Sequence, residues 1–223
     1  MQRHRLVVAT VFVAAAVVVA GIAFAATRTH AIAATNNPFE SYVYDGRHHT
    51  SAAVPVIGGG STTVTLDTST AQVLQQNGVT VAPVAPASAS TTGGGVAVSF
   101  PVTGGEAFIF PTSDLPYVRG DVTHSGGLTF SAGSKSLTVT NFIVNPGTSL
   151  LTASVGTAEV PLFELDGRNV KVGSDSSGNP TLDGTVLRLS PQAADALNAT
   201  FGVSLFKEGI PVGTAHIVLM PAS

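Results

Sequence analysis

The feature that most restricts the fold is a two-residue alternation of apolar side chains, repeated in short segments along the chain. Large apolar residues occupy every second position over residues 96–102, and the segments 128–130 and 137–140 flank a Ser-Ala-Gly-Ser turn. Such alternation places the apolar side chains on one face of an extended strand. Turn residues separate these segments at the spacing of about 8–12 residues that is typical of all-β domains. The sequence therefore predicts an all-β fold, mainly an antiparallel sandwich or a partly open barrel, with two short helices.

Both helices are expected directly after a strand. Residues 63–66 alternate like a strand, Asp67 follows as a helix N-cap, and the helix ends at an Asn-Gly pair. Near the C-terminus, residues 187–189 are followed by Ser190 as N-cap, by a proline at the first helical position, and by a helix that ends before Gly202. The recurrence has two readings, an internal pseudo-symmetry or two helices that are capped independently, and both stay open.

The remaining strands are expected to be short. Beyond Asn141 the apolar positions shift by one residue, which predicts a β-bulge there. Residues 83–90 are expected to form a linker, because Pro, Ala and Ser dominate them. The other expected strands cover residues 79–81, 150–155, 160–165, 170–172 and 212–220.

The N-terminus has the pattern of a secretory signal peptide. Arg3 and Arg5 precede an apolar run over residues 6–26, and Ala23-Phe24-Ala25 fits the small-residue rule for cleavage. We expect residues 1–25 to be a signal peptide, with a second site of the same type at residues 31–33. The other reading is an uncleaved anchor, since a run of this length can span a bilayer. Contact with a membrane is expected only in that case.

The rest of the chain divides into an arm and a domain. Residues 26–60 contain two adjacent His, two Pro and the run Gly58-Gly59-Gly60, which predicts a flexible N-terminal arm. Residues 61–223 are expected to form a single β-sandwich domain, because their length needs no second domain. The signal peptide places this domain outside the cell or in the cell envelope.

Composition excludes several classes of function. The chain has no Cys, and it has 10 basic and 13 acidic residues. It therefore offers no disulfide, no cysteine nucleophile and no thiolate metal site. The few basic residues are scattered, which argues against binding of nucleic acid. No Gly-rich phosphate loop opens a helix, so no nucleotide is expected.

No residue pattern specifies catalysis. The sequence has neither the G-x-S-x-G phrase of serine hydrolases nor the H-E-x-x-H phrase of zinc proteases. Asp121, His124 and Ser125 have the residue types of a catalytic triad, but triad members normally converge from separate segments. We expect His124 to be a hairpin-end residue bonded to the backbone, and His216 to be a satisfied or solvent-facing strand residue. We therefore expect no enzyme.

Acidic residues give two further candidate sites, a carboxylate pair and a calcium loop, but neither pattern specifies a function. Glu164 and Asp166 share one face of a strand by the two-residue period, but a carboxylate pair alone defines no reaction. The loop at residues 175–179, followed by Asp183, has the oxygen-rich composition of a calcium loop. It lacks the glutamate of an EF-hand, and a polar hairpin turn explains it equally well. We expect no metal.

Four phrases of the chain resemble a family of secreted, β-rich actinobacterial proteins to which no activity is assigned. They are the segment 63–67, Phe-Pro-Val-Thr-Gly-Gly at 100–105, His-Ser-Gly-Gly-Leu-Thr-Phe at 124–130, and the segment 196–202. The resemblance covers most of the chain after the signal peptide.

The central part is more distantly similar to the HtaA-type domains of haem-uptake proteins in Gram-positive actinobacteria. The similar features are Phe-Pro-Val at 100–102, the Gly-Gly turn, the strands around Phe130 and Leu137, and the strand at 150–155. These domains are β-rich and bind haem through the tyrosine of an F-x-S-Y-V phrase, and residues 39–43 read Phe-Glu-Ser-Tyr-Val. The resemblance therefore implies Tyr42 as a haem ligand.

One part of that pattern differs here. The family places a His that supports the tyrosine three residues after the strand Phe, and this position is Gly133. His124 or His48 would then have to support Tyr42. The other reading of Tyr42 is an aromatic side chain that docks the arm on the domain.

Two functions from different classes are expected. The first is a non-catalytic β-sandwich protein, secreted or in the cell envelope, that acts as a binding or structural module for an unidentified extracellular or cell-wall partner and uses no cofactor. The alternative is an HtaA-like protein that binds haem, with Tyr42 and His124 as the binding residues.

Overall fold

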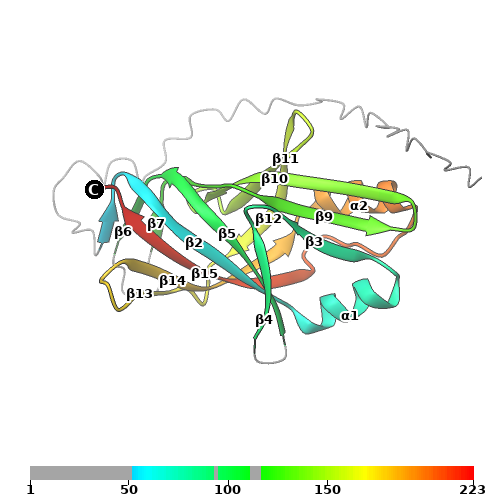
Figure 1. Ribbon diagram of the computed structural model, residues 1–223, viewed down its shortest axis with the longest axis horizontal. Helices are drawn as coiled ribbons and strands as arrows, with labels where there is room; N and C mark the ends of the chain where they lie inside the picture. The colour runs from blue at the N-terminus through cyan, green and yellow to red at the C-terminus, as the bar shows by residue number, and fades with distance from the viewer. Residues whose placement is uncertain (1–51, 93–94, 111–116) are drawn as a thin grey trace, which may run out of the picture. The chain divides into compact units, whose positions relative to one another are not determined.

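The computed structural model describes residues 52–92, 95–110 and 117–223 (Figure 1). The first elements are β1 (Ala52–Val54), β2 (Ile57–Leu66), α1 (Thr68–Gln76), β3 (Thr80–Val84), β4 (Ser88–Thr92), β5 (Gly95–Gly105), β6 (Ala107–Phe110), β7 (Tyr117–Arg119) and β8 (Val122–His124). They are followed by β9 (Gly127–Ala132), β10 (Lys135–Asn145), β11 (Leu150–Val155), β12 (Ala158–Asp166), β13 (Lys171–Ser174), β14 (Pro180–Leu189), α2 (Pro191–Phe201) and β15 (Pro211–Pro221).

Most of the described strands belong to one antiparallel sheet that closes on itself. Neighbouring strands pair along the path β11-β12-β14-β15-β2-β5-β8-β10, and β10 also pairs with β11. Among the described residues, these eight strands therefore form a closed circle, which we call the ring. Strands β9 and β3 extend from β10, β13 pairs with β14, and β4 pairs with β5. The prediction of an all-β, mainly antiparallel fold with two short helices is confirmed within this part of the chain.

Strand β10 closes the ring by changing partner at a bulge. Its first part pairs with β9, and its last residues pair with β8 on one side and β11 on the other. The register shifts between Thr140 and Ile143, and Asn141 between them has a φ of 53°. Asparagine occupies this left-handed region more readily than most residues. The predicted bulge at Asn141 is confirmed, and it lets one long strand serve both a hairpin and the ring.

The alternation seen in the sequence separates the interior of the ring from its outer face. In β15, Ala215, Ile217 and Leu219 are buried, whereas Thr214 before them and His216 between them are exposed. Strands β15 and β2 come from opposite ends of the described chain and lie side by side, drawn red and cyan in Figure 1. Because these two strands pair, their inward-facing side chains belong to one interior of the ring.

The helices begin at the predicted caps. The Asp67 side chain accepts a hydrogen bond from the Thr70 amide at 3.0 Å, and the Ser190 hydroxyl accepts one from the Ala193 amide at 3.0 Å. Helix α2 ends at Gly202, whose φ is 68°. Strands β2 and β14, which precede the helices, lie on either side of β15. That placement agrees with both readings of the strand–helix repeat.

The helices differ in burial. Helix α2 buries the side chains Ala193, Ala194, Leu197 and Phe201 and contacts β10 and β12, whereas α1 has no buried residue. In the described part of the chain, neither helix has the length and hydropathy that crossing a membrane requires.

The folded part begins earlier than we expected. Strand β1 and residues 57–60 of β2 lie within the segment 26–60 that was predicted as a flexible arm. β1 pairs with β6, and the glycine run pairs with β15. Glycine favours turns, so the run predicts an interruption, but here the glycines form part of a strand. The rest of the arm and the signal peptide lie outside the described residues.

The linker predicted at residues 83–90 is wrong for most of its length. β3 continues to Val84 and pairs with β9, and β4 begins at Ser88 and pairs with β5. The proline at position 83 fits this position, because β3 is the last strand on its side of the sheet and proline within sheets is largely confined to such edge strands.

Candidate functional site

The ring encloses a cavity of about 400 Å³. Small-molecule sites usually have volumes of roughly 300–1,000 Å³, whereas ordinary protein interiors are packed without spaces of this size. The wall is mainly apolar and receives large side chains from strands around the ring: Val64 (β2), Phe100 (β5), Phe142 (β10), Leu151 (β11), Phe163 (β12) and Leu187 (β14). The rings of Phe100 and Phe142 meet edge to face, with their centroids 4.9 Å apart. The cavity is therefore the candidate site.

No charged side chain lines the cavity among the described residues. The wall contains no Asp, Glu, Lys or Arg, and its side-chain polar groups are the hydroxyls of Thr62, Tyr117, Ser149 and Thr185 and the imidazole of His124. An ion buried among apolar groups without a partner costs several kcal/mol. The wall is therefore suited to an uncharged molecule.

His124 is the polar centre of the wall. It is 5% exposed, at the end of β8. Its Nδ1 lies 3.1 Å from the carbonyl oxygen of Phe142, and its Nε2 lies 2.7 Å from Oγ1 of Thr62. The expected bond to the backbone is present, but the imidazole lies inside the ring and also contacts a side chain that the sequence analysis did not single out.

The partners of His124 determine where its proton lies. A carbonyl oxygen only accepts, so Nδ1–H donates to Phe142, and Nε2 accepts the hydroxyl proton of Thr62. Burial lowers the pKa of His124 below its ordinary value. The imidazole is therefore neutral near pH 7.

The cavity opens to solvent at one end of the ring. Gly147 and Ser149, in the loop between β10 and β11, line the cavity and are exposed. Gly167 and Val170, in the loop after β12, also line it, and β11 begins beside the end of β12. The two loops therefore border the same opening.

The loop at the opening is fixed by hydrogen bonds. The Asn145 side chain accepts from the Thr148 amide at 2.9 Å and donates to the Asp121 carboxylate at 2.7 Å. The Ser149 carbonyl accepts from the Leu165 amide at 2.8 Å, which ties this loop to β12. The entrance is thus a defined feature of the fold.

The residues of a triad do not come together around His124. The Asp121 carboxylate accepts from Asn145, whereas both ring nitrogens of His124 bond to Thr62 and Phe142. A base in a triad needs one nitrogen on the nucleophile and the other on an orienting acid. This geometry lacks the acid.

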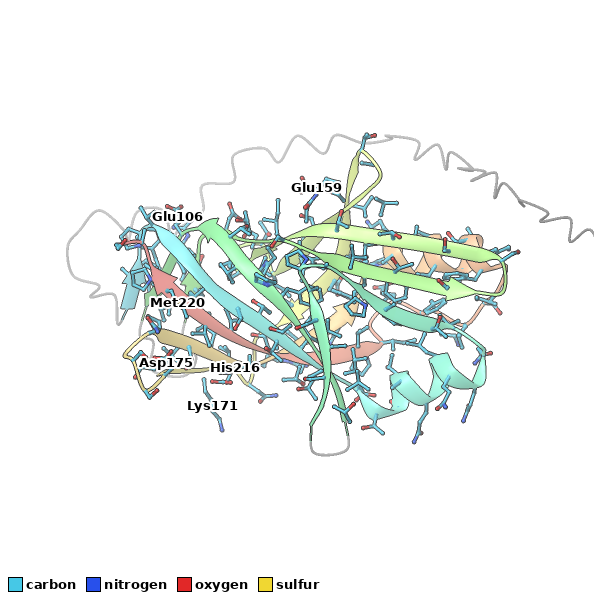
Figure 2. All side chains as sticks on the ribbon, viewed as in Figure 1. Glu106, Glu159, Lys171, Asp175, His216 and Met220 are labelled. Atoms are coloured by element: carbon cyan, nitrogen blue, oxygen red, sulfur yellow. The ribbon has the colours of Figure 1, made fainter. Side chains whose placement is uncertain are left out.

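His216 lies on the outer face of the ring, as expected. It is half exposed and pairs with Asp183 on the neighbouring strand. Figure 2 shows its side chain away from the interior, near the same edge as Lys171 and Asp175. Asp175 accepts from the amides of Ser177 and Asn179, so the calcium-like loop forms a self-bonded turn between β13 and β14. No group of three potential metal ligands occurs within the described residues.

The described residues leave the haem prediction untested. Tyr42, implied as the haem ligand, lies outside them. His124 is one of the two residues that would have to support Tyr42. Both of its imidazole nitrogens are bonded to Thr62 and Phe142, so neither nitrogen is free for a tyrosine. Haem binding stays a prediction of the resemblance.

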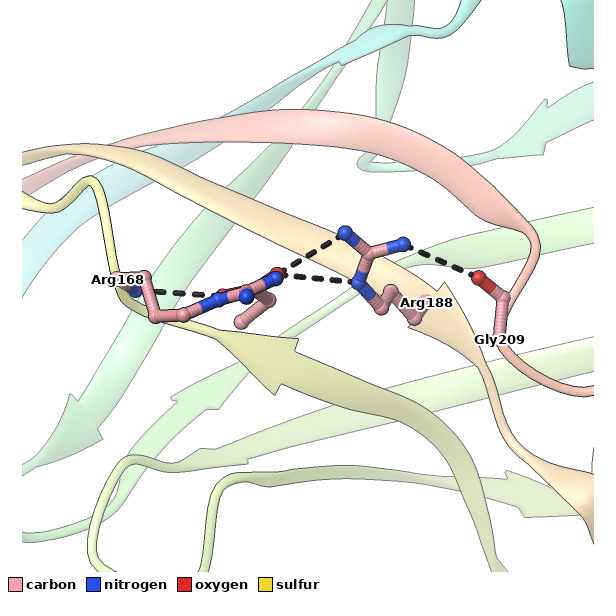
Figure 3. A network of polar contacts seen from close by, with 4 residues as sticks. Arg168, Arg188 and Gly209 are labelled. Atoms are coloured by element: carbon pink, nitrogen blue, oxygen red, sulfur yellow. Dashed lines mark hydrogen bonds and ion pairs between the residues drawn. The ribbon is translucent and has the colours of Figure 1, made fainter.

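Asp166 joins Arg168 and Arg188 at the edge of the ring. The close-up in Figure 3 labels both arginines and draws their polar contacts as dashed lines. Asp166 accepts from Arg168 at 2.6 and 2.8 Å and from Arg188 at 3.0 and 3.1 Å. Arg188 also donates to the carbonyl of Gly209 at 3.2 Å. Asp166 is therefore engaged in ion pairs that tie β12 to β14, and Arg188 extends the network to the segment before β15.

We predict that Asp166→Asn lowers the free energy of unfolding by about 0.5–1 kcal/mol at pH 7. The bonds from Arg168 and then Arg188 hold the pKa of Asp166 well below its usual range. A carboxyl whose pKa is lower in the folded state stabilises the fold above its ordinary pKa of about 4, and this contribution fades as the pH falls further. Urea denaturation of both proteins at pH 7, 4 and 2.5 measures the difference. Asp195→Asn, at an exposed site on α2, is the control, and a difference independent of pH would contradict the prediction.

Comparison with the models of known protein families gives no match, and comparison with curated protein sequences gives none. The candidate site therefore has to be interpreted from its own geometry.

Thr62 is not among the residues predicted from the sequence, and it lies 62 positions before its partner His124. The sequence does contain an indication of its position, because Thr62, Val64 and Leu66 are each two residues apart and so lie on the same face of the strand. A hydroxyl in line with inward-facing apolar residues indicates a polar group inside the fold.

Proposed function

We propose that this protein is an exported, non-catalytic binding protein of the cell envelope or extracellular space, and that it holds a small, mainly apolar, uncharged molecule inside the ring. The cavity of about 400 Å³ with its uncharged wall is the observation that supports the proposal. Barrels of about eight strands are wide enough to hold one small ligand. The apolar run after Arg3 and Arg5 supports export.

The size of the cavity limits the size of the ligand, and the size of the ligand gives the affinity to expect. Ligands of this size gain about 0.3–0.5 kcal/mol per non-hydrogen atom. A neutral probe such as N-phenyl-1-naphthylamine, with its 17 non-hydrogen atoms, would then gain roughly 5–8 kcal/mol, which is a Kd between about 0.2 mM and about 1 µM.

We predict that Ala215→Phe weakens binding of N-phenyl-1-naphthylamine at least tenfold. Ala215 is buried and lines the cavity, so a phenyl group there occupies the space of the ligand. Fluorescence titration of this probe, which brightens in apolar surroundings, measures the Kd. Thr214→Phe adds the same group on the outer face of the same strand, and it should bind the probe like the wild type.

Circular dichroism shows whether each variant has folded, and Ala215→Leu is a smaller step if the phenyl group prevents folding. The proposal fails if the folded wild-type protein gives no saturable signal, or if folded Ala215→Phe binds the probe as tightly as the wild type. A Soret band after addition of hemin, lost in Tyr42→Ala, would instead favour the haem-binding alternative.

A further inference from the structure

Building on the proposed function, we infer that the molecule held in the cavity is neutral and carries a hydrogen-bond donor, such as a hydroxyl, which donates to the Thr62 hydroxyl oxygen. Apolar molecules with only acceptors, and carboxylates such as fatty acids, are then weaker ligands of the same cavity.

The preference for a donor follows from a chain of oriented hydrogen bonds. The carbonyl of Phe142 fixes the proton of His124 on Nδ1, and Nε2 then takes the hydroxyl proton of Thr62 at 2.7 Å. With its proton engaged, the Thr62 oxygen retains only lone pairs for a further partner. Bonds in such a chain polarise one another, which strengthens the terminal acceptor.

The position of Thr62 makes this acceptor available inside the cavity. Thr62 is 5% exposed and lines the cavity with Phe100, its neighbour across the β2–β5 ladder. A ligand hydroxyl that reached the cavity without a partner would lose its bonds to water, at a cost of about 1–3 kcal/mol. The bond to Thr62 restores one of them.

A carboxylate finds no counter-ion in the described wall. The side chains there are apolar, hydroxyl-bearing or imidazole groups, without Lys or Arg. The single titratable cation candidate, His124, is buried and donates its Nδ1 proton to a backbone carbonyl. A carboxylate would therefore meet the lone pairs of Thr62 in apolar surroundings, which repel it.

Thr185 does not set the preference. Its hydroxyl lines the cavity from β14, and no side chain fixes the direction of its proton among the hydrogen bonds of the described residues, so it can donate or accept. Thr185→Val is therefore the control for loss of a cavity hydroxyl outside the oriented chain.

Four probes of one shape test the inference by displacing N-phenyl-1-naphthylamine at pH 7. They are 2-naphthol, 2-methoxynaphthalene, naphthalene and 2-naphthoate, which present a donor, an acceptor only, no polar group and a charge. We expect 2-naphthol to bind about 3–10-fold more tightly than naphthalene and 2-methoxynaphthalene, which is the usual net value of one hydrogen bond. We expect 2-naphthoate to bind at least tenfold more weakly than naphthalene.

A variant of the chain provides the second readout. In His124→Phe the Thr62 proton is no longer engaged, so Thr62 can donate to the ether oxygen. The ratio of the affinities for 2-naphthol and 2-methoxynaphthalene should then fall toward one, whereas Thr185→Val should keep the wild-type ratio. His124→Leu replaces the first variant if circular dichroism shows that it does not fold.

Failure of this inference differs from failure of the proposed function. If 2-naphthol and 2-methoxynaphthalene displace the fluorescent probe equally from the wild type, or 2-naphthoate displaces it best, the donor preference is wrong and the cavity still binds ligands. The inference also fails if none of the four displaces a bound probe. If the fluorescent probe itself does not bind, the proposed function is wrong.

Discussion

Replacing Gly60 with alanine is expected to lower the free energy of unfolding by at least about 3 kcal/mol, or to prevent folding. Gly60 has a φ of 126°, which L side chains rarely adopt, and a Cβ there would lie 2.0 Å from the carbonyl oxygen of Val218. Gly60 pairs with Leu219 in the ladder between β2 and β15. The added methyl group would therefore force apart two neighbouring strands of the ring.

The adjacent glycine is the matched control. A Cβ at Gly59 meets no atom within 4 Å, and Gly59 pairs with Met220 in the same ladder. Alanine in a strand loses less backbone entropy on folding than glycine, so Gly59→Ala should be neutral or slightly stabilising. Urea denaturation followed by circular dichroism compares the variants. Equal unfolding free energies for the two would show that β2 and β15 do not approach as described.

Leu219→Ala is expected to cost about 2–5 kcal/mol, the range for a buried leucine whose removal leaves a space. Leu219 is 0% exposed, and Met220 beside it is 46% exposed. Because successive side chains of a strand point to opposite faces, Met220→Ala should change the unfolding free energy by no more than about 0.5 kcal/mol.

Urea denaturation followed by circular dichroism also measures the unfolding free energies of Leu219→Ala and Met220→Ala. A large loss for Met220→Ala together with a small loss for Leu219→Ala would mean that β15 is shifted by one residue, with its faces exchanged. Such a shift would also turn Ala215 away from the cavity and His216 into it. The pair therefore tests the register that forms the cavity wall.

Local patterns were sufficient to predict much of the fold. Asp67 and Ser190 were recognised as helix caps because the capping bonds involve residues only three positions away. The bulge at Asn141 was recognised from a change in alternation phase within one strand. Each of these features depends on interactions among neighbours in the sequence.

Closure of the ring could not be predicted in the same way. It depends on which strands pair, and β15 pairs with β2 from the other end of the described chain. The glycine run was misinterpreted for the same reason, because the need for Gly60 arises from a close approach to Val218 that the sequence does not show. Strands as short as β7 and β8, with three residues each, have too little alternation to be recognised.

The candidate site was only partly predictable. His124 was identified as a candidate from its residue type, but its position in the cavity wall follows from the ring, and its partner Thr62 comes from a strand far away in the sequence. The haem interpretation depended on Tyr42, outside the described residues, whereas the cavity is formed by the strands themselves.

The most direct measurement is a crystal structure of the protein grown with 6-bromo-2-naphthol, in which anomalous scattering locates the bromine. We predict one bromine peak inside the ring, with the naphthol oxygen within hydrogen-bond distance of Oγ1 of Thr62. A ring whose own side chains fill its interior, with bromine only on the outer surface, would contradict the proposal that this fold encloses a ligand.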